Sequence, residues 1–574
     1  MPNDLYTLEG ERLTGVPWNV YPRPQLKRKS FFCLNGEWEF AEAGSDPLPD
    51  TYPERIRVPF PPESLLSGIH RTFARDTRLY YRRTFSLPDG FVSGRVLLHF
   101  GAVDQHATVY LNGTLLGEHH GGYQPFSFDI TEHLQEENTL VVRATDDLHN
   151  HVLPYGKQTE TPKGMWYTPV TGIWQTVWCE SVPEQYIRSL RMETEADRVH
   201  ITVDGVTNGT VTVGDLAVPL TNGTATLVFD EPHWWSPEDP YLYTATITAG
   251  DDTVQTYFAL RTLTVETVDG IQRLCLNGKP YFFHGLLDQG YYSDGLFLPA
   301  TPEGFTQDIL AMKNLGFNTL RKHIKIEPEQ FYYDCDRLGM IVFQDMVNNG
   351  DYSFWRDTAL PTIGIKRRND KRLHRDPATR EAFLTGMTQT VEQLYNHPSI
   401  CYWTIFNEGW GQFDGAAAYK QLQTLDTSRF IDTASGWFAG VPSDVESLHV
   451  YFKSVKLPKS DKPLVLSEFG GYSHKVNGHV FNDKEYGYRS FADREAFEHA
   501  LLDLYETQIV PAVKQGLCAA VYTQVSDIEE EVNGLLTYDR KVLKYNPAVL
   551  KAAHEAIIRR ASESAKENRE GITP

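Results

Sequence analysis

Cysteine is scarce in this sequence. Only six cysteines occur among 574 residues, and no two of them form a Cys-x-x-Cys pair. A dense disulfide scaffold and a zinc ribbon both need closely spaced cysteines, so the spacing excludes both. We expect most of the six to be small residues of a hydrophobic core.

Long apolar runs are also lacking. The stretch from Met1 to Leu13 is polar, and nowhere does the chain have the roughly 18 uninterrupted apolar residues that a membrane-spanning helix needs. The sequence therefore predicts neither a signal peptide nor a membrane span. We expect a cytoplasmic protein.

Clusters of positive charge are missing too. Lysine and arginine number 54 against 75 aspartates and glutamates, which gives a formal net charge of -21. Charge of this sign repels phosphate backbones and anionic membranes. We therefore expect no nucleic acid or membrane as partner, and neutral small molecules as the easier ligands.

The length and the strand signals predict several domains. A chain of 574 residues is longer than one hydrophobic core supports. Residues 1–182 contain short β-rich segments separated by turn signals, which is typical of a jelly-roll β-sandwich. Residues 183–266 repeat this pattern on a smaller scale and favour an immunoglobulin-like sandwich. The predicted strands are Arg95–Phe100, Ala107–Leu111 and Thr139–Ala144 in the first domain, and Val199–Val203, Gly209–Val213, Thr224–Phe229 and Tyr241–Ala249 in the second.

From residue 267 to 574 the pattern changes. Brief apolar runs now alternate with helical stretches, and this alternation predicts parallel strands joined by helices. Eight such runs are present, the number that a closed (β/α)8 TIM barrel requires. They are Tyr281–Leu287, Asn318–Ile324, Ile341–Asp345, Ile400–Phe406, Phe430–Ala434, Val445–Val450, Pro463–Ser467 and Ala519–Gln524. The last part, Arg560 to Pro574, is polar and is expected to fray.

Two glutamates follow predicted barrel strands. Glu408 lies in Phe406-Asn407-Glu408-Gly409-Trp410-Gly411 after the fourth strand, and Glu468 lies in Leu466-Ser467-Glu468-Phe469-Gly470 on the seventh. The carboxyl ends of barrel strands are where such barrels hold their active sites. Two carboxylates that face each other across a pocket can cleave a glycosidic bond.

Several further motifs give the sequence a family resemblance. They are Leu34-Asn35-Gly36-Glu37-Trp38, Thr171-Gly172-Ile173-Trp174-Gln175, Trp235-Ser236-Pro237 with Pro240-Tyr241-Leu242-Tyr243, and Asn318-Thr319-Leu320-Arg321. Together with both glutamate motifs they resemble family 2 of the glycoside hydrolases, which includes β-galactosidases, β-glucuronidases and β-mannosidases. The resemblance implies Glu408 as general acid/base, Glu468 as nucleophile, and double displacement with retention of anomeric configuration.

The resemblance also implies a set of residues that would bind substrate. Asn407 would hydrogen-bond the sugar 2-hydroxyl, Tyr451 would position the nucleophile, and Arg321 would keep that nucleophile ionised. Trp437 and Tyr522, at the ends of the fifth and eighth strands, are candidates for walls of the sugar site, with core packing as the alternative. His323 and Asp288 complete the candidates.

Two motifs of the family are absent, one that binds a metal ion and one that binds a sugar carboxylate. The stretch Asp345 to Gly350 offers neither the glutamate nor the histidine that hold magnesium in lactose-cleaving relatives, so we predict no metal there and no cofactor, although a site around Asp345 stays open. Glucuronidases grip the sugar carboxylate with Asn-x-Lys, whereas this chain has Glu530-Glu531-Val532-Asn533-Gly534, whose acidic residues would repel a uronate.

The sugar is the open question. The motifs favour a retaining exo-β-glycosidase, with β-galactoside ahead of β-mannoside, β-glucuronide and arabinoside. Asn482-Asp483-Lys484, Lys322 or Lys325 could still supply charge for a uronate. From another functional class, the alternative is a carbohydrate-binding protein without turnover. The sequence does not separate transglycosylation from hydrolysis. A homo-oligomer is a further expectation.

Overall fold

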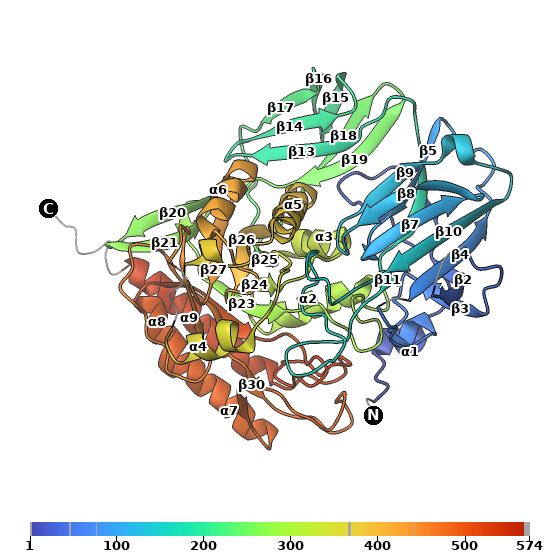
Figure 1. The fold of residues 1–574 in the computed structure, drawn as a ribbon. Coiled ribbons are helices and arrows are strands. Elements are labelled where there is room, and N and C mark those ends of the chain that lie inside the picture. The colour runs from blue at the N-terminus through green and yellow to red at the C-terminus, as the bar shows by residue number, and fades with distance from the viewer. Residues whose placement is uncertain (1–2, 45–47, 76, 366–368, 439, 567–574) are drawn as a thin grey trace.

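The computed structural model describes residues 3–44, 48–75, 77–365, 369–438 and 440–566. In Figure 1 two β-rich bodies, coloured blue and green, lie beside a larger body that runs from light green through yellow to red. The larger body is the predicted barrel, so the predicted multidomain architecture is confirmed. All six cysteines are free thiols, five of them buried, as their spacing led us to expect. Of the helices in the described part, none is long and apolar enough to cross a membrane.

The first domain is a sandwich of two antiparallel sheets. One sheet has the order β1-β12-β5-β9 and the other β3-β2-β4-β10-β7-β8. Trp38, Phe100 and Val142 are among the fully buried side chains that fill the space between the sheets. The elements are α1 Leu8–Arg12, β1 Phe32–Cys33, β2 Gly36–Ala43, β3 Glu54–Val58, β4 Arg78–Phe85, β5 Arg95–Phe100, β6 Val103–Asp104, β7 His106–Leu111, β8 Thr114–His120, β9 Phe126–Asp129, β10 Asn138–Thr145, β11 Gly172–Ile173 and β12 Val177–Val182.

The second domain is one antiparallel sheet that folds over on itself. Its order is β13-β14-β17-β16-β15-β18-β19, and β16 meets β17 through a single residue pair, Thr221 with Thr224. Because this link is so short, the two halves can face each other and share one core, which includes Ile201, Leu227 and Ile247. The strands are β13 Ser189–Thr194, β14 Arg198–Asp204, β15 Asn208–Val213, β16 Leu216–Thr221, β17 Thr224–Val228, β18 Tyr243–Ala249 and β19 Asp252–Phe258.

A small antiparallel sheet leads into the barrel. It consists of β20 Leu263–Val268, β21 Ile271–Leu276 and β22 Lys279–Pro280. The predicted division between residues 266 and 267 therefore falls inside β20.

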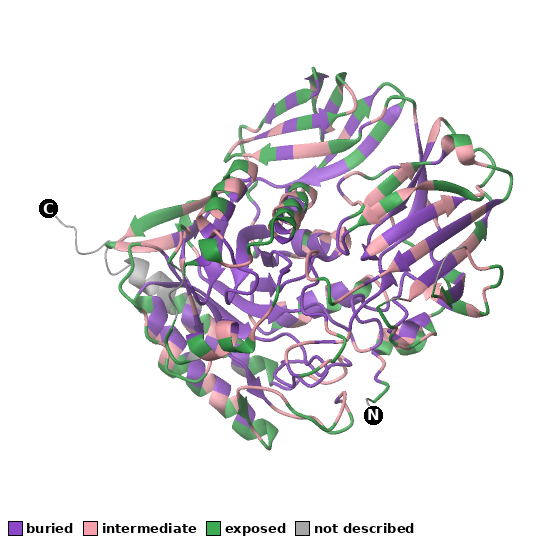
Figure 2. Ribbon diagram, viewed as in Figure 1, coloured by how far each residue is buried: buried purple, intermediate pink, exposed green. Residues whose placement is uncertain are grey.

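All eight predicted barrel strands are present. The parallel sheet has the order β27-β26-β25-β24-β23-β32-β29-β28, which is the chain order of a barrel. Figure 2 shows these strands as almost entirely buried, which explains their continuous apolar runs. Their bounds are β23 Phe283–Asp288, β24 Thr319–Lys322, β25 Ile341–Asp345, β26 Ile400–Asn407, β27 Phe430–Ser435, β28 Glu446–Val450, β29 Leu464–Gly470 and β32 Leu517–Thr523.

The regular alternation of strands and helices fails in one region. Helices follow the other strands, but the described residues between β27 and β28 and between β28 and β29 contain none. These connections carry Gly436, Pro442 and Pro458, which interrupt helices. The helices are α2 Glu303–Asn314, α3 Glu329–Leu338, α4 Leu360–Thr362, α5 Pro377–Leu394, α6 Gly415–Leu425, α7 Arg494–Leu504, α8 Val510–Lys514 and α9 Pro547–Lys566, and a two-stranded sheet pairs β30 Tyr472–Ser473 with β31 Arg489–Ser490.

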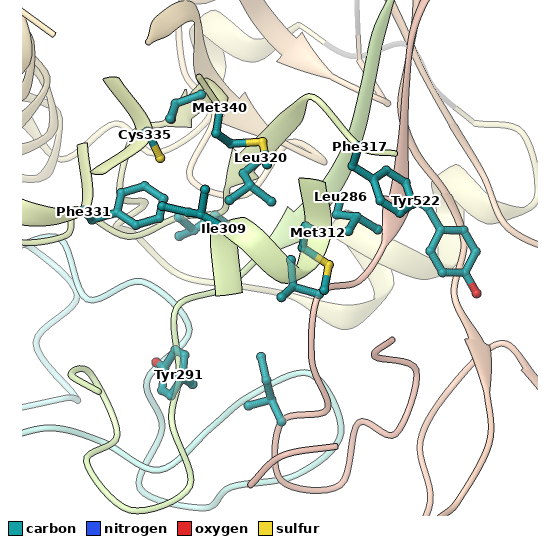
Figure 3. Packing of buried hydrophobic residues seen from close by; sticks show 14 of the residues in the cluster. Leu286, Tyr291, Ile309, Met312, Phe317, Leu320, Phe331, Cys335, Met340 and Tyr522 are labelled. Carbon is teal, nitrogen blue, oxygen red and sulfur yellow. The ribbon is translucent and has the colours of Figure 1, made fainter. Parts of the chain in front are cut away.

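The barrel core extends outward between strands and helices. Figure 3 shows Leu286 and Leu320 of the sheet packed with Ile309 and Met312 of α2. At the C-terminal end the prediction of fraying from Arg560 is wrong as far as Lys566, because α9 continues to that residue. The alanine, glutamate and lysine content of this stretch favours a helix. Residues 567–574 of the predicted frayed end lie outside the described part.

Candidate active site

Glu408 and Glu468 meet at the carboxyl ends of their strands. Glu408 directly follows β26, and Glu468 lies near the end of β29. One carboxylate oxygen of Glu408 lies within 4.8 Å of one carboxylate oxygen of Glu468. The two side chains are nearly buried, with 8% and 4% of their residues' surface exposed, so both face a largely dehydrated space. Two carboxyl groups about 5 to 5.5 Å apart are the arrangement of retaining glycosidases.

The backbone at Glu408 is strained. Its φ of 50° lies in the left-handed region, which a residue with a side chain seldom adopts. The amide N–H of Glu408 donates to the carbonyl oxygen of Ser435 on β27 over 3.0 Å. β26 ends at Asn407, directly before this left-handed residue, and backbone strain of this kind is found at active sites.

Arg321 on β24 binds Glu468 and two further side chains of the site. Its guanidinium donates from Nη1 to Oε1 of Glu468 over 2.9 Å, from Nη2 to Oδ1 of Asn407 over 2.9 Å, and from Nε to Oδ1 of Asp345 over 3.0 Å. The planar fork of arginine suits such simultaneous contacts. With its Oδ1 occupied in this way, Asn407 is oriented so that its amide N–H groups remain for a ligand.

Glu468 is held as a carboxylate. Burial alone would raise the pKa of Glu468, but the charges of His449 and Arg321 outweigh it and lower the pKa to about 2. The hydroxyl of Tyr451 also donates to Oε2 of Glu468, on the side opposite Arg321. Glu468 is therefore ionised at neutral pH and fixed in orientation, as a nucleophile must be.

His449 is a site residue that the sequence reasoning missed. Its Nδ1 lies 2.9 Å from Oε1 of Glu408, and its Nε2 lies 3.6 Å from Oε1 of Glu468. Nε2 is also 3.1 Å from the hydroxyl of Ser435. The signal was available, because His449 lies on the predicted sixth strand, two residues before Tyr451, which was already a candidate.

His323 and Asp345 form a buried pair beside Arg321. Nδ1 of His323 lies 2.7 Å from Oδ2 of Asp345, and burial lowers the pKa of His323 to about 4. His323 is thus neutral at pH 7, with Nδ1–H donating to the carboxylate and Nε2 left as an acceptor. Both Asp345 oxygens accept hydrogen bonds from protein groups, and the absence of a metal at Asp345 stays a prediction.

The lysines considered for a uronate are bound elsewhere. Lys322 donates to Oδ2 of Asp288 over 2.7 Å and to Glu327, and Lys325 donates to both oxygens of Glu327. The other Asp288 oxygen accepts from the N–H of Gly290. The Asp288 carboxylate is therefore part of this buried network, and no contact joins it to Glu408 or Glu468 in the described part of the chain.

The two aromatic candidates lie in different surroundings. Trp437 is 8% exposed, and its ring centre is 6.4 Å from that of His449, so it borders the catalytic group. Tyr522 is fully buried, its hydroxyl accepts from the N–H of Tyr472, and Figure 3 places it in the hydrophobic core. Core packing, the alternative reading for Tyr522, thus describes its position.

A loop of the first domain reaches the barrel at this point. Three consecutive glutamates of the barrel each accept a hydrogen bond from it: Glu529 from the N–H of Thr168, Glu530 from the N–H of Gly164, and Glu531 from the hydroxyl of Tyr167. No motif in the sequence predicts this use of the acidic run.

The same loop adds aromatic surface next to Glu408. The ring of Trp166 stacks on that of Trp410 at 5.3 Å and contacts Tyr352 at 4.9 Å. Trp166, Tyr352 and Tyr155 also line a cavity of about 550 Å³. Trp166 thus contacts both this cavity and Trp410, which is two residues from Glu408. The aromatic side chains of the cavity are of the kind that sugar rings stack against.

Three family descriptions match consecutive parts of the chain. "Glycosyl hydrolase 2 galactose-binding domain-like" matches residues 69–170, "Glycosyl hydrolases family 2" matches residues 186–261, and "Glycosyl hydrolases family 2, TIM barrel domain" matches residues 267–554. The order of the three agrees with the order of the domains along the chain.

Known proteins are similar over most of this chain. A β-galactosidase of Aeromonas hydrophila is 27% identical over 484 residues, covering 73% of this chain and 44% of that protein. A putative β-glucuronidase of Formosa agariphila is 24% identical over 531 residues, covering 81% of this chain and 60% of that protein. The chain thus spans about half the length of these curated relatives.

The fold is likewise shared with solved structures. The β-D-glucuronidase of Dictyoglomus thermophilum superposes with a TM-score of 0.71 at 19% identity, covering 94% of this chain and 98% of that one. At this identity the likeness concerns the fold alone. With the family matches across all three domains, the chain belongs to glycosyl hydrolases family 2.

Proposed function

We propose that the protein is a retaining exo-β-glycosidase, with a terminal β-galactoside as its first candidate substrate. The observation that carries the proposal is the approach of Glu408 and Glu468 to within 4.8 Å at the ends of β26 and β29. That separation suits direct attack on the anomeric carbon, because a water molecule placed between the carboxyl groups would need about 6.5 to 9.5 Å.

The neighbours of each carboxyl group support opposite roles. Glu468, held ionised by Arg321 and Tyr451, attacks the anomeric carbon and forms the glycosyl-enzyme bond. Glu408 gives its proton to the departing glycosidic oxygen and later takes a proton from water, which displaces Glu468. His449, 2.9 Å from Glu408, holds the acid toward the scissile bond in both steps.

Asn407 supports the transition state. Its side-chain oxygen accepts from Arg321, so its N–H groups are directed as donors. A bond from them to the sugar 2-hydroxyl strengthens as positive charge develops at the anomeric centre, and such an interaction accelerates the chemical step.

The ion pairs that the candidate lysines already make favour a neutral sugar as substrate. Lys322 and Lys325 are bound to Asp288 and Glu327, and Lys484 makes an ion pair with Glu530 over 3.0 Å. None of these three is left for a sugar carboxylate. We therefore place β-galactoside ahead of β-mannoside, arabinoside and β-glucuronide.

A substrate panel tests the proposal. Wild type and Glu468→Gln are compared on 4-nitrophenyl β- and α-glycosides by nitrophenol release. We expect one β-glycoside to dominate and the substitution, which keeps size but removes the attacking charge, to lower kcat by a factor on the order of 10³ or more. Near-normal turnover by Glu468→Gln would refute the nucleophile assignment, and no turnover of any glycoside by wild type would refute the proposed function.

A further inference from the structure

Lys157 is a nearly buried lysine whose ammonium contacts two aromatic rings but no hydrogen-bond acceptor among the described residues. Only 7% of its surface is exposed, and its Nζ has no hydrogen bond or salt bridge with any residue of the described part. By contrast, the buried Lys544 donates to Oδ1 of Asp527 and to the carbonyl oxygen of Val532. A nearly buried ammonium without an acceptor is unfavourable, so a ligand hydroxyl could supply the hydrogen-bond partner that the described residues do not.

The backbone holds Lys157 in a fixed place. The carbonyl oxygen of Lys157 accepts from the N–H of Tyr167 over 3.0 Å, and Thr159 N–H donates to the carbonyl oxygen of Tyr167 over 3.1 Å. Gln158 points to the sandwich, where its Nε2 donates to Oδ2 of Asp104 over 2.7 Å. Lys157 instead points toward the barrel, because its Nζ lies 5.6 Å from the ring centre of Trp410.

The surroundings of Lys157 belong to the catalytic group. Its Nζ lies 5.6 Å from the ring centre of Tyr167 and 5.6 Å from that of Trp410, which is two residues from Glu408. Burial lowers the pKa of Lys157, while the nearby charges of Glu531 and Glu468 oppose that shift. The ammonium thus lies beside Trp410, near the space that a sugar bound at Glu408 and Glu468 would occupy.

We propose that Lys157 is a specificity-determining residue, which donates hydrogen bonds to a hydroxyl group of a neutral sugar bound at Glu408 and Glu468. The inference rests on the proposed function and deepens it. A hydroxyl fits better than a carboxylate, because Glu531 and Glu468 already supply negative charge around this ammonium. Three N–H donors aimed at a small polar group also give strong selection, since a sugar lacking that group leaves them unpaired.

The first domain therefore completes the active site of the barrel. Tyr167 and Lys157 face each other across the loop, and the hydroxyl of Tyr167 donates to Glu531 and accepts from Nε2 of Gln289 over 2.6 Å. These bonds hold the loop, and therefore the ammonium of Lys157, in place relative to the barrel.

The test compares Lys157→Met with wild type on the best neutral 4-nitrophenyl β-glycoside and on analogues that lack one hydroxyl group each. We expect Lys157→Met to lower kcat/KM on the parent sugar roughly 100-fold or more, and to match wild type on one analogue. Lys420→Met, which alters an exposed lysine of α6, is the matched control and should leave kcat/KM unchanged. Methionine fills the buried site without a charge, so the melting temperature should stay equal or rise.

Three results would overturn the inference. One is a change of less than threefold on the parent sugar. Another is an equal loss on every analogue, which indicates a role in folding or general electrostatics rather than contact with one hydroxyl. The third is a wild-type preference for uronides that Lys157→Met removes, because a carboxylate is then the partner. If wild type turns over a β-glycoside of the panel, the proposed function stands, and each of these three results then counts against the role of Lys157 alone.

Discussion

At the scale of single residues, two glutamates receive different chemistry from their neighbours. Glu468 accepts hydrogen bonds from Arg321 and Tyr451, and its pKa falls to about 2. Glu408 contacts His449 and lies on strained backbone with a φ of 50°. The side chains are identical, so the proposed division of labour between nucleophile and acid would come from position alone.

Replacing Glu408 should have an effect that depends on the leaving group. Glu408→Gln removes the proton donor, and general acid catalysis contributes about 10²- to 10⁴-fold. We expect a loss of that size in kcat/KM for alkyl β-glycosides and a far smaller loss for 2,4-dinitrophenyl β-glycosides, whose leaving group needs no proton. Equal losses on both substrates, measured by initial rates, would argue against Glu408 as the acid.

The ionised state of Glu468 should make its contribution to stability depend on pH. Because the folded-state pKa of about 2 lies below the ordinary 4.5, ionised Glu468 stabilises the fold above pH 4.5 and loses this effect as the pH falls toward 2. The melting temperature of wild type should therefore fall toward that of Glu468→Gln over this window, as scanning calorimetry can measure. If the difference in melting temperature between wild type and Glu468→Gln stays constant or grows on acidification, Glu468 is not held ionised by its neighbours.

His449 is a positioning residue in this scheme. His449→Ala removes the group 2.9 Å from Glu408, and we expect kcat to fall about 10- to 100-fold with little change in KM, by analogy with the loss of groups that orient a catalytic ligand. The loss should be greater for substrates with poor leaving groups, because the acid is what becomes misplaced. A change confined to KM would instead assign His449 to substrate binding.

At the scale of elements, strand ends were predictable and the loop over them was not. The predicted bounds of β25 agree with the structure, and Glu408 and Glu468 follow from their place after apolar runs. Lys157 and Tyr167 precede the barrel by more than a hundred residues, and only tertiary packing brings them to Glu531. Such contacts leave no periodic pattern in the sequence.

The loop should depend on one tyrosine hydroxyl. Tyr167→Phe leaves Glu531 and Gln289 with fewer partners in a buried place, which lowers the free energy of unfolding by about 1 to 3 kcal/mol. We also expect faster proteolysis within residues 157–168 and a lower kcat/KM, since Lys157 loses its support. Tyr281→Phe, at a more exposed hydroxyl bonded to Glu238, is the control, and equal effects of both changes would refute a special role for the loop.

At the scale of the whole molecule, Asp336 joins the second domain to the barrel. Its carboxylate accepts from the hydroxyl of Tyr257 over 2.7 Å and from the N–H of Ser399 over 2.8 Å, and lies 2.7 Å from Nδ1 of His397. Its backbone oxygen accepts from Nε1 of Trp235. These groups are buried, so the two domains share one polar network and are expected to unfold together.

Removing this junction should weaken the entire chain. Asp336→Ala leaves several buried donors unpaired, and we expect the free energy of unfolding to fall by about 3 to 5 kcal/mol. Tyr257→Phe removes one hydroxyl of the same network and should be milder, by about 1 kcal/mol. Denaturant titration measures both, and an Asp336→Ala protein as stable as wild type would show that the domains are held together by other contacts.

The most direct measurement is the stereochemistry of the first product. Proton NMR during hydrolysis of the best β-glycoside distinguishes the β-anomer of the released sugar from the α-anomer before mutarotation mixes them. Attack by Glu468, within 4.8 Å of Glu408, predicts that the β-anomer appears first. An α-anomer as the first product would mean direct displacement by water and would contradict the nucleophilic role of Glu468.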